Sequence, residues 1–293
     1  MLNFVSPGKI TKVHEIYRAC LKEMGINDTL GCDAPEEEQC IKSGEDFFLK
    51  YNLQLIINEG DTIFDVGANE GRYAETVSKL YPQSKIYAFE PHPYTCMRLA
   101  ARKLSNVQVE QVALGKSNGK CTLFERSDDP NGSEMASLYE SVITDFHGVS
   151  SIGLDVNMKT VDSLVEEYAI DTIGLLKIDV EGSELDVVQG ARESIKKGKI
   201  KCIQYEFNHP NIESRVFMKD FRRELGDYVL FRLLEKGATE LIDHPIFQEI
   251  FGYQNIVAIH KSIVDSQKYK DLVKHFVKKS REEALSADDK TEG

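Results

Sequence analysis

The chain has 293 residues, of which 41% are hydrophobic and 29% charged, a composition typical of a soluble globular protein. Its 48 acidic and 36 basic residues give a formal net charge of −12. This balance argues against a nucleic-acid partner, because affinity for a phosphate backbone rests largely on cation contacts. No apolar run approaches the roughly 18 residues of a membrane span.

The start of the chain lacks the basic and apolar regions of a secretory signal. The six cysteines are scattered, with no C-x-x-C pair, which argues against both a disulfide framework and a zinc site. We therefore expect reduced thiols in a cytoplasmic protein.

Residues 1–60 are predicted to form a helical extension. Apolar residues recur at three- and four-residue spacing from Val13 to Met24, which is typical of one face of an amphipathic helix. A second helix is predicted to begin at Asp33, with Pro35 in its first turn and Gly44 as a break. Two roles are open for this extension: it could cover the functional site, or it could build a homo-oligomer.

From residue 61 to about residue 260, short apolar runs alternate with helical patterns. The runs are typical of strands that are buried on both faces. They lie at residues 62–66, 85–90, 107–112, 173–179, 200–207, 228–234 and 255–259. This alternation predicts one α/β domain with a doubly wound, mainly parallel sheet.

Two segments depart from the alternation. Residues 120–125 and 154–159 are predicted to form an inserted strand pair, joined by a long polar loop from Asp128 to Ser151. A loop of this length is usually either a substrate lid or mobile, and we expect it to be mobile without substrate and ordered with it. Residues 261–293 are predicted to form a last amphipathic helix, from Tyr269 to Val277, and a charged tail.

The strongest functional signal is the run Asp65-Val66-Gly67-Ala68-Asn69-Glu70-Gly71, which follows a predicted strand and opens a predicted helix. Glycines in such a turn let the backbone approach a ligand closely, and a helix N-terminus offers N–H groups to an anion. Glu90 ends the next predicted strand, where a carboxylate can accept both hydroxyls of a ribose. The two features together predict a site for a nucleoside-containing cofactor.

The identity of that cofactor follows from the spacing of the glycines. A dinucleotide site favours G-x-G-x-x-G, whereas here the spacing is G-x-x-x-G, with Asn69 where a second close glycine would stand. An anionic Asp65 would also repel a pyrophosphate. S-adenosylmethionine carries an ammonium that suits Asp65, directly or through water, and a carboxylate that suits the helix N-terminus.

Several further motifs follow in order along the chain. Residues 61–260 resemble the FkbM-type S-adenosylmethionine-dependent methyltransferases in the glycine turn and in Phe89-Glu90-Pro91-His92-Pro93, Val112-Ala113-Leu114-Gly115, Ala136-Ser137-Leu138-Tyr139, Thr160-Val161-Asp162-Ser163-Leu164 and Leu176-Lys177-Ile178-Asp179-Val180-Glu181-Gly182-Ser183-Glu184. The resemblance implies a seven-stranded Rossmann-like sheet with one antiparallel strand, and O-methylation of a sugar or small molecule. Residues 1–60 carry no such resemblance. Glu70 stands where many family members have an apolar residue, so the acceptor is not transferred from the family.

The resemblance also implies which residues bind the cofactor. They are Asp65, Gly67, Asn69, Gly71, Glu90, Pro91, His92, Val112 and Ala113. Of these, His92 is expected to line the adenine pocket. Sulfonium methyl transfer needs no metal, but an alcohol attacks well only when a base removes its proton, which is typically worth about 10²–10⁴-fold in rate.

Asp179, Glu181, Glu206 and His209 are the candidate catalytic residues. Asp179 and Glu181 follow the predicted fourth core strand, and Glu206 and His209 end the fifth. Glu184 belongs to the same block, but an acid in the first turn of a helix can equally serve as a cap. Asp179, Glu206 and His209 could alternatively hold a divalent ion.

Two other function classes fit parts of the sequence. A non-catalytic cofactor-binding subunit would keep the fold but lack a base, and the acids at one sheet edge argue against it. A nicotinamide-dependent oxidoreductase is disfavoured by the glycine spacing. The sequence therefore favours an O-methyltransferase that acts on a saccharide or small-molecule hydroxyl.

Overall fold

The structure is a computed structural model that describes residues 7–26, 43–129 and 136–264, with side chains described from residue 15 onward. Three predicted features lie wholly or partly outside these ranges: the helix from Asp33, the helix from Tyr269 to Val277, and the part of the polar loop around Pro130. Among the described residues, no helix is both long and apolar enough to span a membrane.

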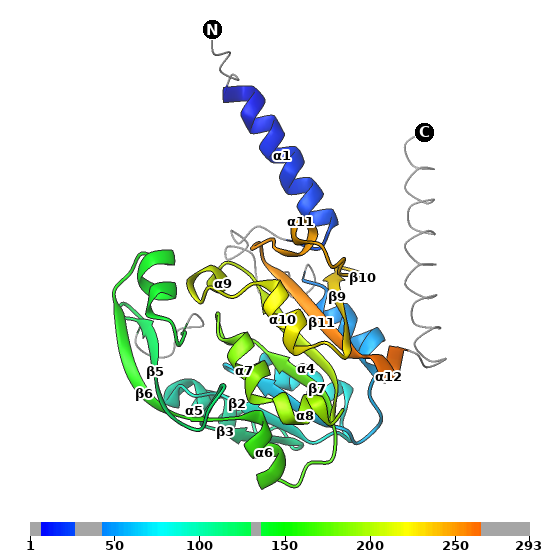
Figure 1. Cartoon of the computed structure of the whole chain (residues 1–293). Coiled ribbons are helices and arrows are strands. Elements are labelled where there is room, and N and C mark those ends of the chain that lie inside the picture. Colours follow the sequence, from blue (N-terminus) through cyan, green and yellow to red (C-terminus); the bar gives the residue numbers. More distant parts are fainter. Residues whose placement is uncertain (1–6, 27–42, 130–135, 265–293) are drawn as a thin grey trace.

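An eight-stranded sheet lies at the centre of the domain, in the order β10-β9-β11-β8-β7-β1-β2-β3 (Figure 1). The strands are β1 (Thr62–Val66), β2 (Ile86–Phe89), β3 (Val107–Glu110), β7 (Ile173–Ile178), β8 (Ile200–Phe207), β9 (Tyr228–Leu234), β10 (Gly237–Glu240) and β11 (Gln254–His260). Strands β3, β2, β1, β7 and β8 pair in parallel, and β11 pairs antiparallel with both β8 and β9. The predicted α/β class and mainly parallel sheet are confirmed.

The strand count differs from the expectation of seven strands with one antiparallel. A tight turn at Glu235 and Lys236 folds the chain back after β9, and β10 pairs antiparallel with β9. The sheet therefore gains an eighth strand at its edge, and both β10 and β11 run against the others. A four-residue strand with two exposed residues carries too little apolar pattern to be found by periodicity.

Helices cover both faces of this sheet. One face, which includes Phe64 and Ile178, packs against α6 (Val161–Glu167), α7 (Glu184–Gly190), α8 (Arg192–Lys196) and α10 (Met218–Glu224). The other face, which includes Ile63 and Leu175, packs against α4 (Arg72–Leu80) and the N-terminal segment α3 (Glu45–Phe47), η2 (Phe48–Asn52) and η3 (Leu53–Leu55). On this side α5 (Pro93–Ala101) also packs, through Leu99.

The N-terminal extension has two described parts. Helix α1 (Pro7–Glu23) confirms the first predicted helix and projects away from the domain, with Ile16 and Tyr17 more than half exposed (Figure 1). Gly44, at φ +80°, stands directly before α3. The predicted break is therefore confirmed, and the residues after Gly44 belong to the core of the domain.

The inserted strand pair is also confirmed. Strands β5 (Gly119–Arg126) and β6 (Ser151–Lys159) pair antiparallel, and β4 (Ala113–Leu114) completes a second sheet on the other edge of β6. Between β5 and β6, Ser137 bridges to Phe124, and a π-helical turn, η4 (Val142–Phe146), follows. The short helices α9 (Pro210–Glu213), α11 (Pro245–Gln248) and α12 (Lys261–Val264) complete the described elements.

Candidate active site

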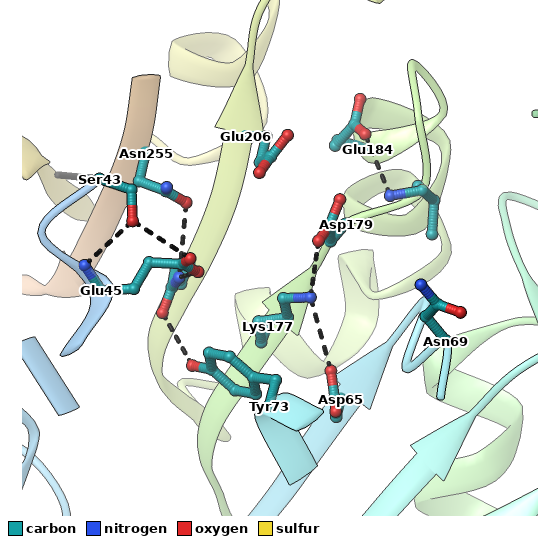
Figure 2. Close-up of polar contacts among 12 residues, drawn as sticks. Ser43, Glu45, Asp65, Asn69, Tyr73, Lys177, Asp179, Glu184, Glu206 and Asn255 are labelled. Carbon is teal, nitrogen blue, oxygen red and sulfur yellow. Dashed lines mark hydrogen bonds and ion pairs between the residues drawn. The ribbon is translucent and has the colours of Figure 1, made fainter. Parts of the chain in front are cut away.

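Four carboxylates lie at the C-terminal ends of neighbouring parallel strands. Asp65 is on β1, Glu90 follows β2, Asp179 follows β7, and Glu206 is on β8. Because β8, β7, β1 and β2 are adjacent and parallel, these residues meet at one edge of the sheet, as the sequence predicted. Figure 2 shows Asp179 and Glu206 on neighbouring elements above Asp65.

The glycine turn after β1 is fixed by close packing. Gly67 has a φ of +76°, and a Cβ there would lie 1.7 Å from the backbone oxygen of Asp179. Gly71 has a φ of +81°, and a Cβ would lie 2.0 Å from the Cδ1 atom of Leu99. Only glycine fits these positions, because both the backbone angle and the space exclude a side chain.

The amides of this turn are used within the protein. The N–H groups of Gly67 and Ala68 both donate to the backbone oxygen of Phe89, at 3.0 Å each. The N–H of Asn69, at φ +45°, donates to Glu90 at 2.9 Å. The turn is thereby locked to the end of β2, and these three donors are occupied.

Glu90 is held in one orientation. Its Oε2 accepts from the N–H of Asn69, and its Oε1 accepts from the N–H of His92 at 2.8 Å. Burial raises the pKa of Glu90 to about 7, although both hydrogen bonds favour the charged form. A carboxyl fixed by two backbone amides still has lone pairs for further donors, so it can accept hydroxyl groups from a ligand.

The other predicted cofactor residues lie around Glu90. His92 is buried and caps α5, with its Nδ1 accepting from the N–H of Thr95, and its Nε2 lies 3.1 Å from Glu125 on β5. Ala113, the first residue of β4, and the preceding Val112 are buried, and Pro91 is half-buried. The imidazole therefore joins α5 to the inserted sheet, and its contact with adenine stays a prediction.

Lys177, on β7, is the cation of the site. Its Nζ lies 2.9 Å from Asp179 and 3.7 Å from Asp65, and it stands 4.9 Å above the centre of the Tyr73 ring (Figure 2). Burial on its own would lower the pKa of Lys177, but the charges of Asp179, Asp65 and Glu45 outweigh it and raise the pKa. The sequence does not reveal a role for Lys177, because a lysine inside a buried run has no periodic signal.

Asp65 is fully buried beneath this edge. Neither of its oxygens makes a hydrogen bond of normal length with the described residues, and the ammonium of Lys177 faces it. Burial raises its pKa, and the charge of Lys177 opposes that rise. The predicted contact between Asp65 and a ligand ammonium stays a prediction.

Three acids follow one another after β7. Asp179 has a side chain that is one-third exposed and accepts a hydrogen bond from Lys177. Glu181 has a φ of +52°, and its backbone oxygen accepts from the hydroxyl of Ser137 at 2.7 Å. Residues of the inserted segment are therefore tied to the turn that carries the acids.

Glu184 has a structural role. Its Oε1 accepts from the N–H groups of Val180 and Gly182, and its Oε2 accepts from the Nδ2 of Asn211. Burial raises its pKa to about 7. It closes the turn before α7, the capping role that was weighed for it, and joins this turn to α9.

The two candidates at the end of β8 have environments unlike that of Asp179. Glu206 is buried and accepts hydrogen bonds from the Tyr253 hydroxyl at 2.8 Å and from Asn208 at 3.1 Å. Its pKa is well above the usual range, chiefly because of burial and then because of the charge of Asp179. It therefore favours the neutral acid, which donates a proton more readily than it accepts one.

His209 packs against the inserted segment. Its ring stacks on that of Phe146 at 3.6 Å, and its Nδ1 is buried without a hydrogen-bond partner among the described residues. Burial, followed by the nearby His147, lowers the pKa of His209 to about 4. A group with so low a pKa is a weak general base at neutral pH.

The alternative of a divalent ion gains no support from the side chains. Within the ranges that the structure describes, no three His, Cys, Asp or Glu residues converge so that they could hold a metal ion. Asp179, Glu206 and His209 therefore do not form a ligand set, and Lys177 occupies the position next to Asp179.

The fold and this edge define a class of protein. A parallel α/β sheet with a glycine turn after its first strand and an oriented acid after the next is the arrangement of enzymes that bind a nucleoside-containing cofactor. The family is shown by sequence: the methyltransferase FkbM domain matches residues 65–237, more than half of the chain. The protein belongs to this family, as the motifs predicted.

Curated relatives agree with this assignment. The chain is 32% identical over 157 residues to the methyltransferase sdnD of Sordaria araneosa, covering 45% of this chain and 60% of the relative. It is 25% identical over 162 residues to the 2-O-methyltransferase NoeI of Sinorhizobium fredii, covering 52% and 66%. It is 30% identical over 152 residues to the hexuronic acid methyltransferase AglP of Haloferax volcanii, covering 49% and 56%. The chain thus spans less than two thirds of these relatives.

Similar solved structures include a METTL16 MTase domain, at 11% identity and a TM-score of 0.42, covering 89% of this chain and 85% of that one. The plantazolicin methyltransferase BpumL, solved in complex with SAH, matches at 11% identity and a TM-score of 0.39, covering 86% and 98%.

Proposed function

We propose that the protein is an S-adenosylmethionine-dependent O-methyltransferase that acts on a hydroxyl of a saccharide or small molecule. The observation that carries this proposal is the placement of two acids at one sheet edge. Glu90 is fixed by two backbone amides beside the glycine turn, and the partly exposed Asp179 lies two strands away. The family match includes both residues. The names of NoeI and AglP, a 2-O-methyltransferase and a hexuronic acid methyltransferase, support an oxygen acceptor and a saccharide.

The described residues fit the proposed cofactor. The Gly67 turn packs directly against the backbone of Asp179, which keeps the ends of β1 and β7 together beside Glu90. Glu90 presents acceptor lone pairs to a ribose. The bound cofactor would supply a methyl group on a positively charged sulfur, and Asp179 is the partly exposed carboxylate at this edge.

The acceptor hydroxyl needs a base, and Asp179 is the best placed of the four candidates. It combines partial exposure with a cation partner, because Lys177 holds its Oδ2 in one orientation. In this role Asp179 accepts the hydroxyl proton, and Glu206 stays hydrogen-bonded to Tyr253 and Asn208 at the same edge. Glu181 would bind the acceptor beside them, and His209 would contact it through its ring.

A turnover assay tests the proposal directly. The protein would be incubated with radiolabelled S-adenosylmethionine and a panel of neutral saccharides, uronic acids and small hydroxylated molecules. We expect label in an ether-linked product and one equivalent of S-adenosylhomocysteine per methyl group. Tight binding of S-adenosylhomocysteine without transfer to any acceptor would favour a non-catalytic subunit, and displacement by NADH would favour an oxidoreductase.

Self-association and location are further predictions. Ile16 and Tyr17 expose apolar surface on a helix that projects from the domain, and we propose that this helix pairs with a second copy. Light scattering of the full chain would show a dimer, and a monomer at all concentrations would contradict it. The cytoplasmic location stays a prediction from the cysteine pattern.

A further inference from the structure

A row of buried polar side chains crosses the sheet beneath the proposed methyl-transfer edge. The strand register pairs Asp65 with Lys177 and Lys177 with Gln204, so the three side chains point to the same face of the sheet. Each is at most 5% exposed. Buried polar groups are costly unless they are paired, so partners for this row must come from the layer that covers this face.

The N-terminal segment that covers this face of the sheet contributes one carboxylate, which contacts the row of buried polar side chains. Glu45, at the start of α3, accepts a hydrogen bond from the Nε2 of Gln204 at 2.6 Å. The Oε1 of Gln204 in turn accepts from the Tyr73 hydroxyl at 2.9 Å, and the Tyr73 ring faces the ammonium of Lys177. The contacts thus lead from Glu45 through Gln204 and Tyr73 to Lys177, which donates a hydrogen bond to Asp179. Figure 2 shows Glu45, Tyr73, Lys177 and Asp179 along this path.

Glu45 is itself held in place. The hydroxyl of Ser43 donates to its Oε2 at 3.3 Å, and the next turns of the chain bury Phe48 and Leu49 in the core. Burial raises the pKa of Glu45, and the charge of Lys177 opposes that rise. The charged groups that face Glu45 include Lys177 and Asp179, on β7 and directly after it, and Glu206 on β8.

We infer that Glu45 is a positioning residue of the proposed methyl-transfer site, acting through Gln204 and Tyr73 to hold Lys177 against Asp179. The inference rests on the proposed function. It gives Glu45 a role in the proposed site, although this residue lies outside the matched family domain. This role differs from both roles expected for the N-terminal extension, because Glu45 acts from beneath the sheet edge.

Loss of Glu45 should loosen each member of the path in turn. The Gln204 amide would lose its short acceptor and keep only Asn255, at 3.5 Å. Gln204 could then turn away from Tyr73, whose ring supports the ammonium of Lys177. The ammonium would gain freedom relative to the carboxylate of Asp179, and misplacement of a reacting group by about 1 Å can cost about 10²-fold in rate.

The test compares Glu45→Gln and Glu45→Ala with a matched control in the full chain. Asp46→Asn removes the neighbouring carboxylate, which bonds to the exposed Lys50 at 3.0 Å and takes no part in the path. For each variant, kcat, the acceptor KM, the affinity for S-adenosylhomocysteine and the ¹⁵N signal of the Lys177 ammonium would be measured.

We expect kcat to fall by at least about tenfold in Glu45→Ala, with the acceptor KM and cofactor affinity within about twofold of wild type. Glu45→Gln keeps an oxygen for Gln204 and should fall less. The Lys177 signal should shift in both variants and stay unchanged in Asp46→Asn. Thermal unfolding of all three variants shows whether any loss of rate merely follows loss of folded protein.

Two results would overturn the inference. One is a kcat in both Glu45 variants that is within twofold of wild type, with an unshifted Lys177 signal. The other is a loss of rate that Asp46→Asn shares or that follows the unfolded fraction. If the wild-type protein transfers no methyl group, the proposed function fails, and the Lys177 signal alone still decides whether Glu45 positions that ammonium.

Discussion

The affinity for S-adenosylhomocysteine should depend on pH through Glu90. Burial raises the pKa of this carboxyl from 4.5 to about 7, against the two backbone amides that favour its charged form. In the free protein Glu90 is therefore neutral below pH 7. Ribose hydroxyls donate more strongly to an ionised carboxylate, so binding should release a proton from Glu90 and should weaken as the pH falls through 7.

The size of the effect follows from the two pKa values. If ribose binding returns the pKa of Glu90 to its ordinary value of 4.5, the free and bound forms differ by the full shift. Linkage then makes binding about tenfold weaker at pH 6 than at pH 8, or about 1.4 kcal/mol. A smaller return of the pKa gives a smaller slope with the same sign.

Calorimetry at pH 6, 7 and 8, in buffers that differ in ionisation enthalpy, measures both the affinity and the number of protons released. Glu90→Gln keeps the shape of the side chain but cannot ionise, so its affinity should be low and nearly independent of pH. Affinity that is flat from pH 6 to 8 in the wild-type protein, or an equal slope in Glu90→Gln, would refute the ribose assignment.

Three further predictions concern catalysis, packing and the acceptor side. Asp179→Asn keeps an oxygen for Lys177 but removes the base, so turnover should fall by at least about 10²-fold in single-turnover assays while cofactor affinity changes little. Gly67→Ala should lower the free energy of unfolding in urea by at least about 2 kcal/mol more than Gly60→Ala, which shares a positive φ but meets no atom within 4 Å. Phe146→Ala should expose the ring of His209 and raise its pKa from about 4 toward 6.5 in an NMR titration, and an unchanged pKa would contradict burial as its cause.

The acids at the sheet edge could be predicted from the sequence because each is recognised from the short stretch of chain around it. Each of Asp65, Glu90, Asp179 and Glu206 ends or follows an apolar run, and parallel strands bring such positions to one edge. Gly67 could be predicted for the same reason, since a strand followed by glycine indicates a turn. Its close contact with the backbone of Asp179 could not, because the two positions are far apart in the chain.

The parts that sequence reasoning missed depend on contacts over long separations. Glu45 and Gln204 are 159 positions apart, and nothing near Glu45 marks it as an acid that contacts the sheet. The sequence places Lys177 within an apolar run but does not predict its ion pairs with Asp65 and Asp179, which depend on the fold. The structural role of Glu184 was predicted as an alternative, since first-turn acids often cap, but its bond to Asn211 required the fold.

Gathering this many carboxylates at one edge has a physical consequence for which of them can act as the base. Burial disfavours the charged form of a carboxyl, and nearby carboxylates add to that effect. The pKa values of Glu90, Glu184 and Glu206 are all raised, chiefly by burial. The side chain of Asp179 is partly exposed and is bonded to Lys177. The proposed base is thus selected by solvent and by one lysine, and the Glu45 path matters because it holds that lysine.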